Sequence, residues 1–419
     1  MISQNQMKKT PSNAWRFKGN ELKYVKELLD KGLAGGPKGS MNARLEDAFA
    51  KRFGVKYAIT SNSGTSTLHQ ALMAFGVKPG DEVITPPLGP FMCTSTILHA
   101  GATPVYADVD QETFTIDPKD IEKKITPRTK AIFAVHTYGG VCDMEAIMGI
   151  AKKHGIYVLE DCAECFLGKD RQGRLAGTIG HAGSFSFQAT KHMTTGDGGM
   201  LITNDEGLAL RMRKFGNHGF KNTAADRRTV KAMKDVVQDP AYLRHDGFGY
   251  NYRFSEILAA VGLGQLEQLD TFVEKRIAMA DEYLKVLKGC SWLKPQKVTG
   301  REVNSYFTLA VLFEGEKKGI SWHDFRKKFM ELGGDSVYAA WALAYREPTS
   351  ALVSGKGRFF DDIPDQGMHV KGFLKDVKCP VAEHLQPRML QFTTNQNTAA
   401  ERKSQATALK KTIEFFGKK

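Results

Sequence analysis

Short apolar segments alternate with helical patterns in the first half of the chain, and this alternation restricts the possible folds more than any other feature. Most intervals between the apolar segments carry an amphipathic helix pattern, as at 65–75, 118–125 and 144–154. Strands separated by helices are typical of a mainly parallel sheet with right-handed crossovers and helices on both faces. We therefore predict a three-layer α/β fold. The expected strands are 57–60, 82–85, 104–107, 131–136, 156–160, 183–187 and 200–203.

The pattern changes near residue 255. Residues 255–287 read as a long helix or a helix pair, and the last third mixes helices with short strands such as 306–313. A chain of 419 residues with 42% hydrophobic content is long enough for two cores. We predict a large domain over residues 1–270, with an N-terminal helix at 19–33, and a smaller C-terminal α+β domain over residues 271–419.

Composition excludes several classes of partner. The net charge is +13, but Lys and Arg are scattered along the whole chain, which is typical of a solvated surface and not of a nucleic-acid stripe. The longest apolar stretches, such as 257–263, fall well short of the roughly 20 residues that span a bilayer. The first ten residues lack the apolar centre of an export signal. We expect no nucleic-acid partner, no membrane association and a cytoplasmic location.

Six dispersed cysteines are too few for a disulfide framework in a chain of this size, so reduced thiols are expected. Cys162 and Cys165 have the C-x-x-C spacing of redox pairs and of half a zinc site. Because no second C-x-x-C and no paired-histidine element follows, a redox or metal module stays a minor alternative, and we predict no metal.

Chemically useful residues follow several of the predicted strands. The run Ser61-Asn-Ser-Gly-Thr65 follows the first strand, Phe91 ends the loop after the second, Asp161 follows the fifth, and Lys191 comes after the sixth. Open α/β sheets bind ligands at the carboxyl ends of their strands. These residues are therefore expected to converge on one pocket.

Lys191 and Asp161 together suggest pyridoxal 5′-phosphate (PLP). A lysine amine forms a Schiff base with the aldehyde of PLP, and a buried aspartate holds the pyridine nitrogen of PLP protonated. Small hydroxyl residues between a strand and a helix, as in 61–67, offer amides and hydroxyls to a phosphate. Singly, each feature is also compatible with a solvated lysine, a turn residue or an N-cap, so the indication comes from the combination.

With these residues the chain resembles the DegT/StrS-type sugar aminotransferases, PLP enzymes of the aspartate-aminotransferase fold, called fold type I. The resemblance covers about residues 15–285. Its motifs are Ser63-Gly-Thr65, Pro79-Gly-Asp-Glu-Val-Ile-Thr-Pro86, Glu160-Asp-Cys-Ala163, Gly183-Ser-Phe-Ser-Phe187, Thr190-Lys-His192, Gly196-Asp-Gly-Gly-Met200 and Gly249-Tyr-Asn-Tyr-Arg-Phe-Ser-Glu256.

The resemblance implies a role for each matched residue. Lys191 would be the Schiff-base lysine and proton carrier, and Asp161 would pair with the pyridinium nitrogen, so these two are the expected catalytic residues. Phe91 would cover one face of the cofactor ring. The other expected cofactor contacts are Ser63, Gly64, Thr65 and Ser186 at the phosphate, Asn251 reaching the phosphate from the neighbouring subunit of a homodimer, and Glu164 near the phenolate oxygen, where the family usually has Gln or His.

The implied activity is transfer of an amino group from glutamate or glutamine to a keto-sugar, nucleotide-linked or phosphorylated, or to a related cyclitol, in amino-sugar biosynthesis. Two alternatives stay open: a PLP-dependent sugar dehydratase, whose members carry His at the lysine position, and a non-catalytic regulatory protein with the PLP fold. Outside this set, His136 is expected to be structural and His192 to support packing. Trp322 and Trp341 are expected to lie in the core.

Overall fold

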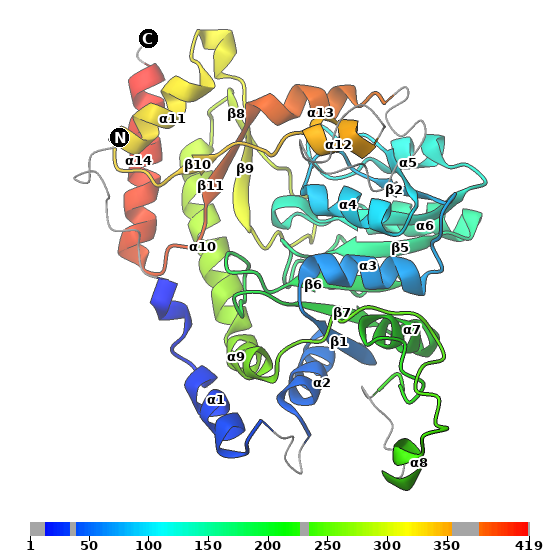
Figure 1. Cartoon of the computed structure of the whole chain (residues 1–419). Helices are drawn as coiled ribbons and strands as arrows, with labels where there is room; N and C mark the ends of the chain where they lie inside the picture. Colours follow the sequence, from blue (N-terminus) through cyan, green and yellow to red (C-terminus); the bar gives the residue numbers. More distant parts are fainter. Residues whose placement is uncertain (1–12, 34–38, 227–233, 354–376, 418–419) are drawn as a thin grey trace.

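The computed structural model describes residues 13–33, 39–226, 234–353 and 377–417, and its largest element is a seven-stranded sheet (Figure 1). The strand order is β1-β7-β6-β5-β4-β2-β3. All seven expected strands are present, with ends shifted by one or two residues, so the predicted α/β class is confirmed. Their bounds are β1 Tyr57–Ser61, β2 Glu82–Thr85, β3 Thr103–Tyr106, β4 Thr129–Val135, β5 Tyr157–Asp161, β6 Ala182–Ser186 and β7 Gly199–Thr203.

The sheet is mainly parallel, as predicted, with one reversed strand. β2 pairs in parallel with β3 and β4, and β5 pairs in parallel with β4 and β6. β7 is antiparallel to both of its neighbours, β6 and β1. The connection between β6 and β7, residues 187–198, contains no helix, so the chain turns back instead of crossing over. This connection therefore lies at the carboxyl end of the parallel strands.

Helices cover both faces of the sheet. On one face, Phe133 of β4 shares a buried core with residues of α3, α4 and α7, while its neighbours Ile132 and Ala134 belong to a separate core with residues of α6 on the opposite face. The alternation of side chains along a strand thus fills two separate cores. The predicted arrangement of one sheet between two layers of helices is confirmed. The helices are α2 Met41–Phe53, α3 Gly64–Ala74, α4 Phe91–His99, α5 Pro118–Lys124, α6 Met144–His154, α7 Glu206–Gly216 and α9 Glu256–Leu266.

The C-terminal part forms a smaller α+β unit around a second sheet. Its four antiparallel strands have the order β10-β11-β9-β8. Tyr283, Phe325 and Phe392 are almost fully buried between this sheet and helices α10, α11 and α14. The bounds are β8 Leu293–Pro295, β9 Thr308–Phe313, β10 Val337–Tyr338, β11 Met389–Thr393, α10 Leu269–Leu287, α11 Trp322–Glu331 and α14 Ala399–Gly417.

Helix α10 belongs to both units. Leu269 and Val273 pack in the core beneath α2 and α9, whereas Met279 and Tyr283 pack in the core of the second sheet. Figure 1 shows this helix running from α9 towards the small sheet. We retain the division near residue 270 as a proposal.

Two elements differ in extent from the expectation. The N-terminal helix α1 is shorter than 19–33 and covers Glu21–Asp30. The strand expected at 306–313 begins at Thr308, because Tyr306 has a left-handed backbone with φ of 47° and its carbonyl accepts a hydrogen bond from Thr394 Oγ1 at 2.6 Å. Among the helices of the described ranges, none has the length and apolar character that crossing a bilayer requires.

Candidate active site

Lys191 lies in a tight turn within the β6–β7 connection. The Lys191 amide donates to the carbonyl of Gln188 at 2.9 Å. The side-chain oxygen of Gln188 accepts from both the amide and the hydroxyl of Thr190, at 2.8 and 2.7 Å. The small hydroxyl residue thus closes the turn, and Lys191 projects from it with only 16% of its side chain exposed.

The amine of Lys191 lies between a carboxylate and an aromatic ring. Its Nζ atom is 3.3 Å from Oε1 of Glu164 and 4.2 Å from the centre of the Phe307 ring. The other carboxylate oxygen of Glu164 accepts from the amide of Tyr138 at 3.0 Å. The carboxylate is therefore held from two sides and orients the amine.

Asp161 ends β5 and is only 4% exposed. Its Oδ1 accepts from the Ala163 amide at 3.0 Å, and its Oδ2 accepts from the Cys93 thiol at 3.3 Å. Burial raises the pKa of Asp161 above its ordinary value, and the Ala163 amide, the Cys93 thiol and the charge of Lys191 work against that increase. A buried carboxylate whose two donors are one backbone amide and one thiol keeps lone pairs with which it can accept an N–H from a ligand.

Helix α3 begins directly after β1 and presents its first turn to the end of β6. Ser63 caps the helix, since its Oγ accepts from the Ser66 amide at 3.0 Å. A Cβ added to Gly64 would lie 2.7 Å from the Cβ of Ser186, so only glycine permits this approach. The amides of Gly64 and Thr65 occupy the first helical positions, where no carbonyl of the same helix reaches them. The arrangement suits an anion such as phosphate.

The two remaining predicted cofactor contacts are Phe91 and Asn251. Phe91 begins α4, two residues before Cys93, so the helix that starts at Phe91 passes next to Asp161. Asn251 is exposed, and its carbonyl is 3.5 Å from Nδ2 of Asn62 in the same chain. The side chain of Asn251 therefore faces outward beside the segment that leads into α3.

Three residues that contact the Lys191 turn were not found from the sequence. They are Phe307, Arg16 and Arg276. Arg276 carried a detectable signal, because it lies three and four residues after Val273 and Phe272, on the apolar face of α10. Phe307 was included in an expected strand, and Arg16 stands in a short 3-10 helix, Asn13–Arg16, with no pattern around it.

Both histidines near these motifs have structural contacts, in agreement with the expectation. His192 is fully buried, and its Nε2 donates to the carbonyl of Ser305 at 3.0 Å. Burial, together with the charges of Arg276, Lys191 and Arg16, lowers the pKa of His192 well below its ordinary value. A neutral imidazole that donates to a backbone carbonyl supports packing.

His136 is linked to the carboxylate of Glu160. Nδ1 of His136 accepts from the Cys142 amide at 3.1 Å, so Nε2 carries the proton and donates to Glu160 at 3.0 Å. Glu160 also accepts three backbone amides, those of Gly177, Ile179 and Gly180. Both ring nitrogens are in use, although within the described ranges His136, Glu160 and Cys162 bring ligand atoms within 4.8 Å of one another.

The C-x-x-C pair is buried. Cys162 and Cys165 are free thiols with no measurable exposure, and the Cys165 thiol donates to the carbonyl of Gly139 at 3.2 Å. Burial raises the pKa of Cys165 to about 12 and that of Cys162 well above its ordinary value. Since the thiolate is the nucleophile and the metal ligand, this environment does not favour redox or metal chemistry.

The expectation that both tryptophans lie in the core is wrong for Trp341, which is 54% exposed. In the segment that follows β10, Ala340 and Leu343 are buried and Trp341 faces the solvent. Trp322 is partly buried, and its indole nitrogen donates to the carbonyl of Met389 at 3.0 Å.

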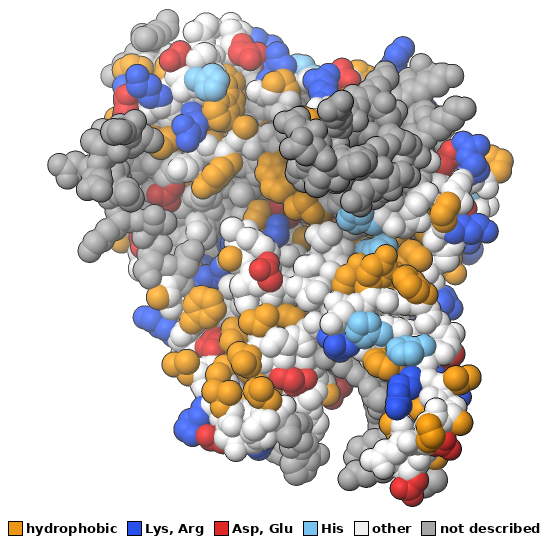
Figure 2. Space-filling view, in the orientation of Figure 1, with side chains coloured by type: hydrophobic (Ala, Val, Ile, Leu, Met, Phe, Trp, Pro, Cys, Tyr) orange, Lys and Arg blue, Asp and Glu red, His pale blue; other side chains and the backbone are white. Residues whose placement is uncertain are grey.

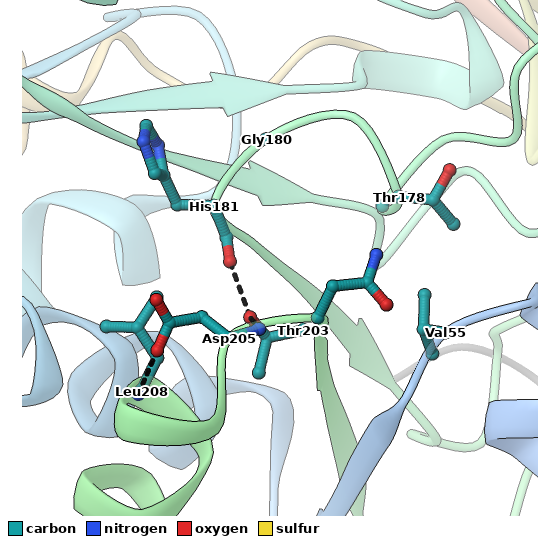
Figure 3. Close-up of a pocket in the computed structure, with 9 residues that line it drawn as sticks. Val55, Thr178, Gly180, His181, Thr203, Asp205 and Leu208 are labelled. Atoms are coloured by element: carbon teal, nitrogen blue, oxygen red, sulfur yellow. Dashed lines mark hydrogen bonds between the residues drawn. The ribbon is translucent and has the colours of Figure 1, made fainter.

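A cavity of about 330 Å³ lies away from the predicted site residues (Figure 3). It is lined by His181, which precedes β6, and by Thr203, which ends β7, so it is at the opposite edge of the sheet from Ser186 and Lys191. The Thr203 hydroxyl donates to the His181 carbonyl at 2.7 Å, and Asp205 caps α7. These polar groups of the cavity wall already have hydrogen-bond partners within the protein, and we assign no ligand to the cavity.

The residues at the carboxyl end of the sheet fit PLP. Asp161 is a buried acceptor for a pyridine N–H, and the start of α3 has free amides for a phosphate. Lys191 projects from the β6–β7 connection beside Glu164. A mainly parallel sheet with these groups at one edge defines the class of PLP-dependent enzymes of fold type I.

Comparison with known proteins extends this assignment. Residues 16–347 match the family model of the DegT/DnrJ/EryC1/StrS aminotransferase family, and the chain belongs to that family. It is similar to GDP-perosamine synthase of Escherichia coli O157:H7, with 40% identity over 306 residues, which are 73% of this chain and 78% of the relative. It is also similar to the spore coat polysaccharide biosynthesis protein SpsC of Bacillus subtilis, with 42% identity over 264 residues, 63% of this chain and 65% of the relative.

Among solved structures, the aminotransferase from Psychrobacter cryohalolentis superposes with a TM-score of 0.82 at 30% identity, covering 97% of this chain and 98% of that chain. PseC of Helicobacter pylori, an aminotransferase involved in pseudoaminic acid biosynthesis, shares the fold with a TM-score of 0.77 at 24% identity, covering 94% of this chain and 96% of that chain. The predicted family, fold type, cofactor and enzyme class are confirmed. The protein is a PLP-dependent aminotransferase of a sugar aminotransferase family.

Proposed function

We propose that the protein transfers an amino group from glutamate or glutamine to the keto group of a nucleotide-linked sugar. The observation that carries this proposal is the 40% identity to GDP-perosamine synthases of two organisms, Escherichia coli O157:H7 and Caulobacter vibrioides, over 306 and 297 residues. Those names point to a GDP-linked sugar. The net charge of +13 suits an acceptor that carries a diphosphate.

In this proposal Lys191 and Asp161 perform the central steps. PLP, when bound, supplies an electron sink for the carbon from which a proton is removed. The Nζ atom of Lys191 would hold the cofactor, and once free it would act as the base that takes the proton from the α-carbon of the amino donor. Asp161 would accept the pyridine N–H, and Glu164, 3.3 Å from Nζ, would orient the amine.

The remaining predicted contacts bind and orient the cofactor. The amides of Gly64 and Thr65 and the hydroxyls of Ser63 and Ser186 bind the phosphate in this proposal, because a helix start and small hydroxyl residues supply donors to an anion. Phe91, at the start of α4, would cover one face of the ring.

We further propose that the enzyme is a homodimer in which Asn251 completes the site of the partner subunit. The loop around Asn251 exposes large apolar side chains: Leu243 is 76% exposed, Phe248 81% and Tyr250 44%. Tyr250 stacks on Tyr252 and contacts His69 of α3. Figure 2 shows hydrophobic side chains and histidines gathered over the region of α3 and α7. Exposed apolar patches of this kind are typical of protein interfaces.

Mixing two inactive variants tests this arrangement. If Asn251 acts across the interface, a mixed dimer of Lys191→Ala and Asn251→Ala contains one site with an intact Lys191 and an intact Asn251, and activity returns on mixing. If Asn251 acts within its own chain, no mixed dimer has an intact site, and mixing restores nothing. Phe248→Asp is expected to shift the protein towards monomer in sedimentation velocity.

We place the reaction in the cytoplasm. All six cysteines are free thiols, five of them buried, which suits a reducing compartment. Fractionation of the cells that make the protein, followed by immunodetection, tests this location.

The experiment that tests the main proposal is a spectrum followed by product analysis. The purified enzyme should show a visible absorbance band that disappears when glutamate or glutamine is added, and Lys191→Ala should abolish turnover. Lys153→Ala, exposed on α6, is the matched control and should behave as wild type. A deoxygenated product formed without an amino donor would favour the dehydratase, and bound cofactor with no response to any amino acid would favour a regulatory role.

A further inference from the structure

Four consecutive carbonyls of the Lys191 turn accept hydrogen bonds from two arginines. Arg16 donates to Ala189 at 3.1 Å, to Lys191 at 2.5 Å and to His192 at 2.9 Å. Arg276 donates to the carbonyl between them, that of Thr190, at 3.1 Å. The backbone on both sides of the lysine is thus fixed by side chains that come from distant parts of the chain.

Both guanidinium groups are buried and are held chiefly by these neutral groups. Arg16 is 5% exposed and Arg276 is 7% exposed. Burial lowers the pKa of Arg16 to about 10. Burial and the nearby charge of Arg16 lower the pKa of Arg276 to about 9. Both remain cations near neutral pH. In the described part of the chain neither forms an ion pair with a carboxylate, so the cost of burying them is offset mainly by the carbonyls.

Arg276 also fixes the ring beneath the amine. Its Nη1 donates to the carbonyl of Phe307 at 2.8 Å and to the Thr394 hydroxyl at 3.0 Å. The centre of the Phe307 ring is 4.2 Å from Lys191 Nζ. One planar guanidinium therefore ties the backbone of the lysine turn to the ring over which the amine lies, a geometry that a lysine ammonium does not reproduce.

We propose that Arg16 and Arg276 are positioning residues that together hold the Lys191 turn, so that Nζ stays between Glu164 and the Phe307 ring. This inference rests on the proposed role of Lys191. Neither arginine touches the reacting atoms, and each acts through the backbone of the turn. A misplacement of about 1 Å at a reacting group costs about 100-fold in rate, which is the scale of effect expected when the turn loosens.

The test compares Arg16→Lys and Arg276→Lys with Arg213→Lys in the dimeric holoenzyme. Arg213 is the control, because it is also buried and donates to backbone carbonyls, those of Ala225 and Ala58, away from the Lys191 turn. It differs in that it also pairs with the Glu46 carboxylate at 2.9 Å, so Arg213→Lys reports the general cost of changing a buried arginine. Three quantities are measured: hydrogen–deuterium exchange of peptide 187–196, the pH midpoint of the visible cofactor band, and the single-turnover rate with glutamate at varied glutamate concentration.

In both Arg16→Lys and Arg276→Lys we expect peptide 187–196 to exchange its amide hydrogens about 10-fold faster than in wild type. The pH midpoint of the cofactor band should shift, and the single-turnover rate should fall about 10- to 100-fold with little change in glutamate affinity. Arg213→Lys should change only thermal stability. Unchanged exchange together with rates within about 2-fold of wild type would overturn the proposal. If Lys191→Ala kept a normal single turnover, the proposed function would fail instead, while the exchange data would still report whether the arginines hold the turn.

Discussion

The amine of Lys191 lies 3.3 Å from Oε1 of Glu164, and the same carboxylate accepts the Tyr138 amide through its other oxygen. Glu164 stands at a position where the resemblance to sugar aminotransferases leads one to expect Gln or His. The chain therefore places a carboxylate beside the lysine that we propose binds the cofactor, and a backbone donor fixes that carboxylate. Substitutions of Glu164 can therefore separate the effect of its negative charge from the effect of its contact with the Tyr138 amide.

Glu164→Gln should leave the fold intact, because an amide oxygen still accepts from Tyr138. Glu164→Ala leaves that partly buried amide without its acceptor and should lower the free energy of unfolding by about 1 to 3 kcal/mol. Urea unfolding of both variants measures the difference. Equal stability of the two would contradict the contact with Tyr138.

Asp161→Asn should stabilise the cofactor-free protein at neutral pH and, in the proposed mechanism, disable the enzyme. Burial raises the pKa of Asp161, so the folded state binds a proton more tightly than the unfolded state, and stability is lost as pH rises from the ordinary value through the raised one. Asparagine avoids this loss, and a gain on the order of 1 kcal/mol is expected at neutral pH. The gain should vanish in acid, below the ordinary aspartate pKa. Thermal unfolding between pH 3 and 8 checks the sign, and a wild type more stable than the variant at pH 7 would refute it.

Gly64→Ala should destabilise the protein by about 1 to 3 kcal/mol and weaken cofactor binding, because the new methyl group would lie 2.7 Å from Ser186 Cβ. Gly149→Ala is the matched control. Gly149 lies within α6 with nothing within 4 Å of an added Cβ, and alanine should stabilise that helix by about 0.5 to 1 kcal/mol. Chemical denaturation and cofactor titration give both quantities. The double variant Gly64→Ala/Ser186→Gly should recover the lost stability, and failure to do so would show that the clash is not the cause.

Replacing Cys162 and Cys165 together by alanine should keep the visible band and leave turnover within about 3-fold of wild type, because both thiols are buried and the pKa of each is raised. Elemental analysis of the wild-type enzyme should find no stoichiometric zinc. Loss of the band in the variant, or one zinc per chain, would revive the redox or metal alternative.

The sequence pattern predicted the parts of the fold that depend on local order. Alternating strands and helices gave the layers, and the strand-end positions of Asp161 and Lys191 placed both at one edge of the sheet. The reversed direction of β7 was missed, because apolar runs show where a strand lies but not which way it pairs. The outward position of Trp341 was missed for a similar reason, since it depends on which side of an irregular segment meets the core.

Contacts across long stretches of chain could not be predicted. The Lys191 turn is contacted by Arg16, Arg276 and Phe307, which are far from it in the sequence and meet it only in the packed fold. Arg276 alone had a local sign, as a charged residue on an apolar helix face. The sequence showed Glu164 at a position where the family usually has Gln or His, but it did not show the contacts of Glu164 with Lys191 and Tyr138.

Helix α10 spans 19 residues, about 28 Å, and has one end in each of two cores. A helix of that length resists bending, so it acts as a stiff rod and not as a flexible joint. The two halves of the molecule should therefore melt together in a single calorimetric peak. The sugar nucleotide that we propose as acceptor should enter by the displacement of side chains and loops at the rim, since a wide swing of one half against the other would require this helix to break.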